Sequence, residues 1–466
     1  MTPRRVLLVA VLAAGAALRV AGANSELWYD EIATVRRYVR SPPVAIASRY
    51  ERVNNHVLTS LLSHASVRAF GEEPWAVRLP SILFGVATVA VFHTLAARFW
   101  PPPVALAAAA LFALSPHHVH YTQNGRGYAA FLFFALLSTE LLWRLAGEPS
   151  PRRARWYGWG YAFAVALGAY ALLLMAFVAA GQAGALVATR RARLLPWLGL
   201  GALLTLLLYA PMLPAITAYY FEHRYPTGHG VASAELLREL RPVAPFLVLG
   251  AIAGPLLLVR MWRRERLGAA LLAFPAAATV GLPALRGQGV HPRWFIFGLP
   301  VAYLLLAEAL DWVRTRRPRA AMAAGAAVAL LSGVALARYY VLPKQAFRQA
   351  LAYVEAARAP GDERIGLGLA GRAARFYDPS VVLVDDAEEL EAWRRSAHRR
   401  TWVVFTFPRQ LRARHPRLLE WVQQATEERA AFPGVIDDGT VYVHVWEPAA
   451  DAARPGSRWS PSTRSR

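Results

Sequence analysis

The sequence predicts a membrane all-α protein with about eleven transmembrane helices and a small α/β domain near the C-terminus. Three observations lead to this prediction. Hydrophobic residues make up 56% of the 466 residues and the mean hydropathy is +0.28, which is too apolar for an ordinary soluble protein. Apolar stretches long enough to cross a bilayer recur up to about residue 340. Short clusters of arginine separate these stretches, as in cytoplasmic loops.

Each membrane span needs about 17 to 25 apolar residues. The run 156–189 is too long for one helix and slightly short for two. Two helices place every dense arginine cluster on one side of the membrane, whereas one helix would put Arg260 to Arg266 on the opposite face, so we expect a break between residues 171 and 172. The predicted spans are 5–23, 78–97, 104–121, 127–144, 156–171, 172–189, 195–214, 243–260, 267–285, 293–312 and 320–338.

The first stretch has a second interpretation. Arg4 and Arg5, an apolar run to Val20 and the small residues 21–23 also resemble a cleavable signal peptide. The residues that follow are the strongest candidates for chemistry and need an anchor at the membrane surface. This favours a retained helix.

The arginine clusters also assign the other segments to a side. Residues 1–340 form the predicted transmembrane domain, in which 24–77 is a long first outer loop with helices at the membrane interface. Residues 341–450 form the predicted outer α/β domain, and 451–466 a disordered tail. In that domain, amphipathic helices at 347–358, 387–398 and 418–429 alternate with β-like runs at 365–369, 381–384, 402–405 and 441–446.

Composition excludes some classes of function. The net charge is +22, but the basic residues lie between apolar runs, so a membrane location explains them better than nucleic acid does. There are no cysteines, which excludes disulfides and thiolate metal sites. Nearly all basic residues are arginine, with Lys344 the only lysine, and we attribute this to genomic composition bias.

Candidate functional residues gather on the predicted outer side. Asp30 and Glu31 directly follow the first helix, where they could serve in chemistry or cap the segment 31–40. Asn55 and His56 precede an apolar stripe of helical period that would lie along the membrane surface.

A second group of polar residues follows the third predicted span. His117, His118 and His120 have no adjacent acid, so interfacial polar residues are favoured over metal ligands. Arg126 and Arg293 lie on the outer face, where the positive-inside rule gives no reason for a cation. An anionic partner such as a lipid phosphate would explain them, and so would snorkelling to lipid headgroups.

Some of these residues form short motifs whose order is informative. The motifs are Tyr29-Asp30-Glu31, Arg78-Leu79-Pro80-Ser81, Ser115-Pro116, Gln123-Asn124-Gly125-Arg126-Gly127-Tyr128, and Arg293-Trp294 followed by Pro300. In this order they resemble the C-type glycosyltransferase superfamily, polytopic enzymes that depend on lipid-phosphate sugars. The similarity is to the bacterial branch related to protein O-mannosyltransferases and the lipid A aminoarabinose transferase. It covers about residues 1 to 350 and is strongest over 24–145.

The resemblance implies an inverting glycosyltransferase that moves a sugar from a polyprenyl-phosphate donor to an acceptor hydroxyl on the outer face of the inner membrane. It implies Asp30 as general base with Glu31 in support. Candidates for binding the donor phosphate are Arg126, Arg293 and Arg78. Candidate contacts to donor or acceptor are His56, Asn55, Tyr128 and Gln123. The family often has a His-Pro-Pro-Leu-like element where this chain has Asn55-His56-Val57-Leu58, which leaves the role of His56 open.

The implied partners are the polyprenyl-phosphate sugar, the bilayer and an acceptor that could be lipid, polysaccharide or protein, with no nucleic acid. The sequence specifies no cofactor and allows a divalent metal without indicating one. The implied location is the bacterial inner (plasma) membrane, with the active site and C-terminal domain facing the periplasm or the cell exterior. A transporter or flippase is the main alternative, although candidate residues at one face and the lack of a repeat count against it. A non-catalytic lipid-binding scaffold of the same fold is the other.

Overall fold

The computed structural model describes residues 3–50, 55–222, 244–285, 292–436 and 438–448. The chain divides into two compact units, and each is described by itself. The first, the membrane unit, contains residues 1–24 and 37–336. The second, the C-terminal unit, contains residues 25–36 and 337–466. The predicted tail 451–466 lies outside the described residues.

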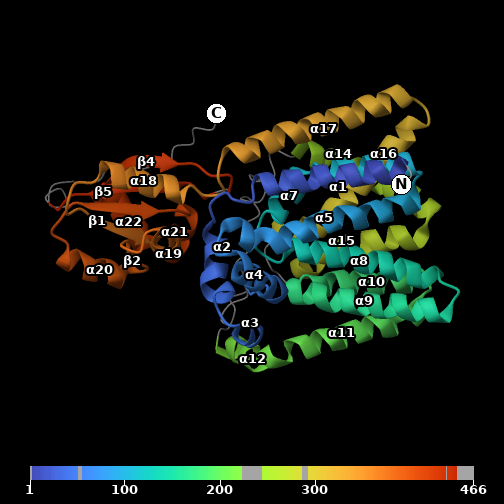
Figure 1. Ribbon diagram of the computed structural model, residues 1–466, viewed down its shortest axis with the longest axis horizontal. Coiled ribbons are helices and arrows are strands. Elements are labelled where there is room, and N and C mark those ends of the chain that lie inside the picture. The colour runs from blue at the N-terminus through green and yellow to red at the C-terminus, as the bar shows by residue number, and fades with distance from the viewer. Residues whose placement is uncertain (1–2, 51–54, 223–243, 286–291, 437, 449–466) are drawn as a thin grey trace. The chain divides into compact units, whose positions relative to one another are not determined.

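The membrane unit consists of helices, most of them long and apolar. In Figure 1, α1, α5, α8, α9 and α11 follow in this order from top to bottom, and each packs against the next one named. The helices are α1 (Pro3–Ala21), α3 (Pro43–Ser48), α4 (Val57–Phe70), α5 (Pro74–Phe99), α6 (Pro102–Ala113), α7 (Pro116–Thr122), α8 (Tyr128–Gly147), α9 (Pro151–Ala171), α10 (Met175–Ala188), α11 (Leu195–Tyr209), α12 (Leu213–Glu222), α14 (Ala244–Arg264), α15 (Arg266–Leu285), α16 (Gly298–Arg314) and α17 (Pro318–Val341), which continues into the C-terminal unit.

The predicted class of a helical, multi-pass membrane protein is confirmed. Among the described residues, six helices are long and apolar enough to cross a bilayer. The count of eleven spans stays a prediction. The break in the run 156–189 is confirmed, because α9 ends at Ala171 and α10 begins at Met175.

The predicted span 104–121 is wrong as one continuous helix. Helix α6 ends at Ala113, and α7 begins at Pro116. The proline has no N–H to continue the helix, and Ser115 caps the new one by accepting a hydrogen bond from the His118 N–H at 3.4 Å. The break brings the polar residues after 114 into a separate short helix.

Buried carboxylates hold the arginine clusters at the predicted inner ends of the helices. Glu140 is 4% exposed and accepts hydrogen bonds from Arg98 and Arg144, each at 2.7 Å. Glu308, on α16, is fully buried and accepts from Arg260 of α14 at 2.9 Å. A buried carboxylate needs such partners, so part of the arginine excess has a structural function in helix packing.

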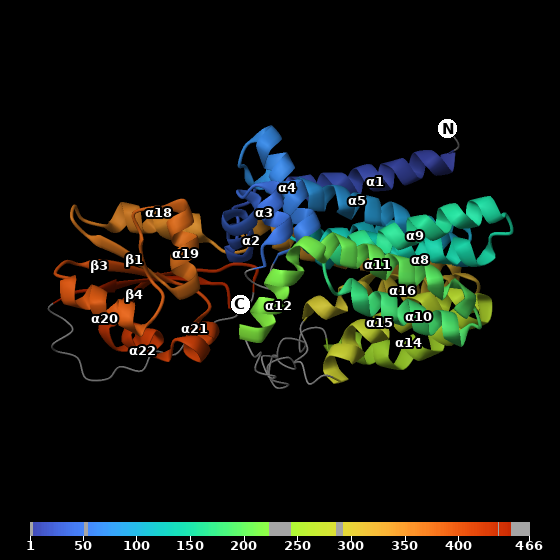
Figure 2. The same cartoon turned by 90° about the horizontal axis from the view of Figure 1, so that it is seen from below.

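The C-terminal unit is an α/β domain around one mixed five-stranded sheet in the order β2-β1-β3-β5-β4. Strands β1, β2 and β3 are parallel, and β3, β5 and β4 are antiparallel. Figure 2 shows α18 and α19 on one side of the sheet and α20, α21 and α22 on the other. The elements are α18 (Phe347–Ala357), β1 (Glu363–Leu367), α19 (Gly368–Tyr377), β2 (Val382–Val384), α20 (Ala387–Ser396), β3 (Thr401–Phe405), α21 (Pro408–Arg414), α22 (Pro416–Ala425), β4 (Thr426–Phe432) and β5 (Val441–Trp446).

The predicted strands in this unit correspond to β1, β2, β3 and β5. The predicted helix 418–429 is wrong in its last turn, because α22 ends at Ala425 and Thr426–Phe432 is strand β4. Its sequence, TEERAAF, has little β propensity. Pairing with β5 determines its conformation, and sequence patterns do not report such tertiary pairing.

Candidate functional site

Asp30 and Glu31 lie in the first turn of helix α2 (Tyr29–Thr34), which belongs to the C-terminal unit. Glu31 is fully buried, and its Oε2 accepts a hydrogen bond from the Trp28 main-chain N–H at 3.4 Å. Glu31 therefore has the capping function considered for this pair. The Asp30 residue is half-buried, and its main-chain carbonyl accepts from the Thr34 hydroxyl at 2.8 Å. The two acids thus differ in exposure.

Residues from the far end of the sequence hold α2 in place. The Tyr29 N–H donates to Gln345 Oε1 at 2.9 Å, and the Tyr377 hydroxyl donates to the Leu27 carbonyl at 2.8 Å. The Arg348 N–H donates to Glu26 Oε2 at 2.8 Å. Burial, with the charge of Glu26 nearby, raises the pKa of Tyr377, so its phenol keeps the proton that it donates.

Lys344 forms an ion pair with Glu31. Its Nζ lies 3.6 Å from Glu31 Oε1, and the exposed fractions of the two side chains are 3% and 0%. A buried ion pair is costly to separate, because removing one partner leaves a buried charge uncompensated. The first acidic motif and the only lysine of the chain are therefore coupled.

Polar residues of the membrane unit gather where α1, α5 and α7 meet. We call Arg19, Arg78, Gln123, Arg126 and their polar neighbours the polar cluster. Arg78, from α5, is fully buried and donates from NH1 to the Ala23 carbonyl at 2.9 Å, just beyond the end of α1. Gln123 is 1% exposed and donates from Nε2 to the Arg19 carbonyl at 2.8 Å. Two predicted site residues thus hold the same helix end.

Arg126, Tyr128 and His56 form a row in the same unit. The Arg126 Cζ lies 5.2 Å from the centre of the Tyr128 ring, and this ring lies 5.6 Å from the His56 ring. Both Arg126 and His56 are 4% exposed. Gly127 makes the row possible, because a Cβ there would lie 2.1 Å from the Ala171 carbonyl oxygen and 2.9 Å from His56 Nδ1. His56 Nδ1 is also 3.1 Å from that carbonyl oxygen.

Arg19 is a cluster residue that sequence reasoning missed. It lies within α1, is fully buried, and places NH2 2.8 Å from His118 Nδ1 of α7. Glycines leave room for its guanidinium, since a Cβ at Gly15 or Gly85 would lie 3.3 or 3.2 Å from it. The missed signal was an arginine in the last turn of an apolar span, because an intramembrane charge is costly and marks a site by default.

Asn55 and Arg293, also predicted as site residues, lie elsewhere in the sequence of elements. The Asn55 Nδ2 donates to the Ile46 carbonyl at 2.9 Å, which joins helix α3 to the start of α4. Arg293 lies in a short 3-10 helix, Pro292–Phe297, and its side chain lies outside the described residues. Within the part of the chain that the structure describes, no three His, Asp or Glu residues come together as metal ligands.

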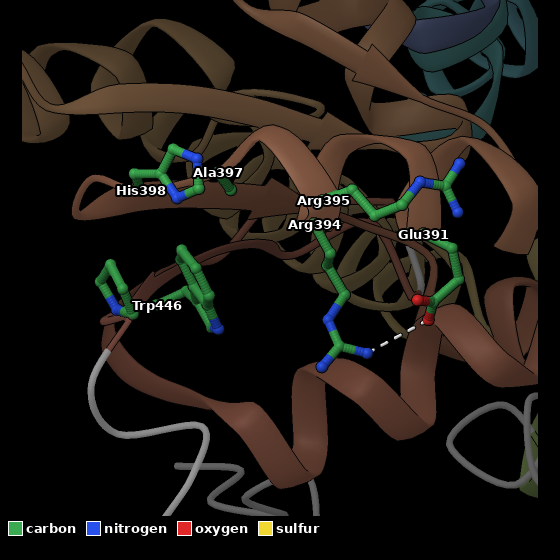
Figure 3. A pocket seen from close by; sticks show the side chains of 7 residues that line it. Glu391, Arg394, Arg395, Ala397, His398 and Trp446 are labelled. Carbon is green, nitrogen blue, oxygen red and sulfur yellow. Dashed lines mark hydrogen bonds and ion pairs between the residues drawn. The ribbon is translucent and has the colours of Figure 1, made fainter.

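The C-terminal unit also has a shallow pocket of about 440 Å³, which Figure 3 shows from close by. Arg394, Arg395, His398 and Trp446 are among its lining residues, and Arg394 pairs with Glu391 at 3.1 Å. No predicted site residue lines this pocket. The pocket is an open depression on the surface, whereas Arg78, Gln123 and Arg126 are buried.

A comparison with known protein families agrees with the resemblance that the motifs indicate. Residues 57–214 match the family model for dolichyl-phosphate-mannose-protein mannosyltransferases. No curated protein matches the sequence.

The fold is similar to those of several solved structures. The crystal structure of ArnT from Cupriavidus metallidurans bound to undecaprenyl phosphate matches with a TM-score of 0.60 and 15% identity, covering 97% of this chain and 99% of that chain. Its apo state matches with a TM-score of 0.59 and 16% identity over the same shares. The oligosaccharyltransferase AglB from Archaeoglobus fulgidus, in complex with an inhibitory peptide and a dolichol-phosphate, matches with 0.54 and 12%, covering 95% and 74%. These matches show that the chain has an ArnT-like fold.

Proposed function

We propose that this chain is an inverting glycosyltransferase that uses a polyprenyl-phosphate sugar and works on the outer face of the bacterial inner membrane. The fold and the family-model match over residues 57–214 support the class of enzyme. The observation that carries the proposal is the polar cluster, in which Arg19, Arg78 and Arg126 are all nearly or fully buried. Three guanidinium groups concentrate positive charge where a lipid-linked phosphate would arrive.

The proposed reaction is one displacement. The acceptor hydroxyl oxygen attacks the anomeric carbon, the bond from that carbon to the phosphate oxygen breaks, and the lipid phosphate leaves with the electron pair. Asp30 takes the hydroxyl proton, and its half-buried position leaves the carboxylate accessible to an acceptor. Glu31 supports Asp30 from a buried position.

The proposed cationic groups act on the leaving phosphate. Arg126, with Arg78 and Arg293, stabilises the charge that develops there. Arg78 also fixes the end of α1 through Ala23. Tyr128, His56, Asn55 and Gln123 remain proposed contacts to the donor or acceptor.

The test is the binding of a polyprenyl phosphate to the purified full-length protein in lipid nanodiscs. We expect saturable binding of undecaprenyl phosphate and at least about tenfold weaker binding of undecaprenol, because only the phosphate can make charge-assisted contacts. Isothermal titration with both lipids measures the difference. Equal affinities would mean that the cluster does not recognise phosphate.

The proposal also requires the C-terminal unit and the site to face outward. An enzyme reporter fused after residue 450 should be active only when it functions outside the cytoplasm, as expected from the position of the arginine clusters. Pairing a periplasm-active phosphatase with a cytoplasm-active reporter gives the measurement and its control. Activity of the cytoplasmic reporter alone would contradict the eleven-span arrangement.

A further inference from the structure

Lys344 is the only lysine in a chain whose other basic residues are all arginine. Composition bias therefore favours arginine at every basic position, and a retained lysine needs a local reason. Lysine has a compact ammonium group, whereas arginine has a planar fork with five N–H donors that all need acceptors when buried. With Lys344 only 3% exposed, the compact group fits a confined space beside Glu31.

The main chain around Lys344 is fixed on two sides. The Pro343 and Lys344 carbonyls accept hydrogen bonds from the Val435 and Ile436 N–H groups, at 2.9 and 3.2 Å. Gly434 permits this approach, since a Cβ there would lie 2.3 Å from the Lys344 carbonyl oxygen. On the other side, Gln345 accepts from the Tyr29 N–H. The ammonium group is therefore held at a defined point relative to α2.

We propose that Lys344 is a positioning residue for the acidic pair, and that the C-terminal unit serves as the scaffold that supplies it. This inference rests on the proposed function and deepens it. The ammonium compensates the buried Glu31 carboxylate and engages it in an ion pair. Asp30, the more exposed acid, is thereby left as the base, with its helix held by Lys344 and Gln345.

The kinetic test compares Lys344→Met, Lys344→Arg and the double variant Glu31→Gln/Lys344→Met in the full-length protein. Methionine keeps the length without the charge, and we expect kcat to fall at least about tenfold with the donor KM within about twofold of wild type. The double variant removes both charges, so it should recover at least about fivefold over Lys344→Met. Arginine keeps the charge but not the shape of lysine. The kcat of Lys344→Arg should therefore lie between those of Lys344→Met and the wild type.

Acylation of the only lysine gives a readout that is independent of turnover. Mass spectrometry of the peptide that contains residue 344 should show slow modification in the folded wild type. The rate should rise at least about threefold in Glu31→Gln, because the amine loses the carboxylate that holds it in the ion pair. Unfolded protein in urea provides the fully reactive control.

The outcomes separate this inference from the proposed function. An inactive Asp30→Asn beside a Lys344→Met variant with wild-type kcat would overturn the role of Lys344 and leave the proposed function standing. A higher donor KM with unchanged kcat would make Lys344 a phosphate ligand and also overturn it. If Lys344→Met does not fold, the kcat of the double variant and the acylation rates test the inference. An inactive double variant together with an unchanged acylation rate in Glu31→Gln would refute the role of the Lys344–Glu31 pair.

Discussion

Asp30→Asn should lower the rate of sugar transfer by roughly 100- to 10,000-fold, the usual cost of removing a general base. Asparagine has nearly the same size as aspartate and caps a helix about as well, so folding and donor binding should be unchanged. Transfer of labelled sugar to acceptor lipid or protein by the purified variant measures the rate, and the undecaprenyl phosphate titration measures binding. A capping role alone predicts near-normal transfer.

The matched control is Glu31→Gln. Glu31 is fully buried and contacts both the Trp28 N–H and Lys344, so its amide keeps the first contact and loses the charge of the second. We expect a loss of about tenfold, well below that of Asp30→Asn. A variant pair in which Glu31→Gln lost transfer and Asp30→Asn retained it would reverse the roles of the two acids. If both variants retained transfer, neither Asp30 nor Glu31 would be the general base.

Arg126→Ala should weaken the binding of undecaprenyl phosphate by about 10- to 150-fold. Losing a hydrogen bond to a charged group costs about 1.5 to 3 kcal/mol, and the burial of Arg126 limits screening by solvent. The affinity for undecaprenol should change little, because it has no phosphate to lose. Isothermal titration of both lipids measures the two effects.

Arg40→Ala is the control for general effects of removing an arginine. Its side chain is 50% exposed and pairs with Glu72 at 2.6 Å on the surface of the membrane unit. Such a pair contributes little, so affinity for the lipid phosphate should stay within about twofold of wild type. An equal loss of affinity in Arg40→Ala and Arg126→Ala would indicate nonspecific attraction between cations and lipid. Arg126 would then be an anchor for lipid headgroups and not a ligand of the donor phosphate.

The elements that could be predicted from the sequence alone are those whose conformation depends on local physical chemistry. An apolar helix in a bilayer satisfies its own backbone, so hydropathy located most of the long helices, and the arginine clusters decided the break in the run 156–189. With this break, all the dense arginine clusters are predicted to lie on the same side of the membrane. Short runs rich in β-branched and aromatic residues likewise predicted β1, β2, β3 and β5, because these residue types favour strands. The motif order indicated a resemblance to the C-type glycosyltransferases, and the structural matches show an ArnT-like fold.

Tertiary structure alone decided the contacts between distant segments. It made Thr426–Phe432 a strand by pairing it with β5, brought Arg19 to His118, and placed residues 25–36 in the C-terminal unit. It also joined Lys344 to Glu31, although 312 residues lie between them in the sequence. In the sequence Lys344 stood out only by composition. A pattern in sequence records the face that each segment buries, whereas the partner of a buried charge depends on which segments the folded chain brings together.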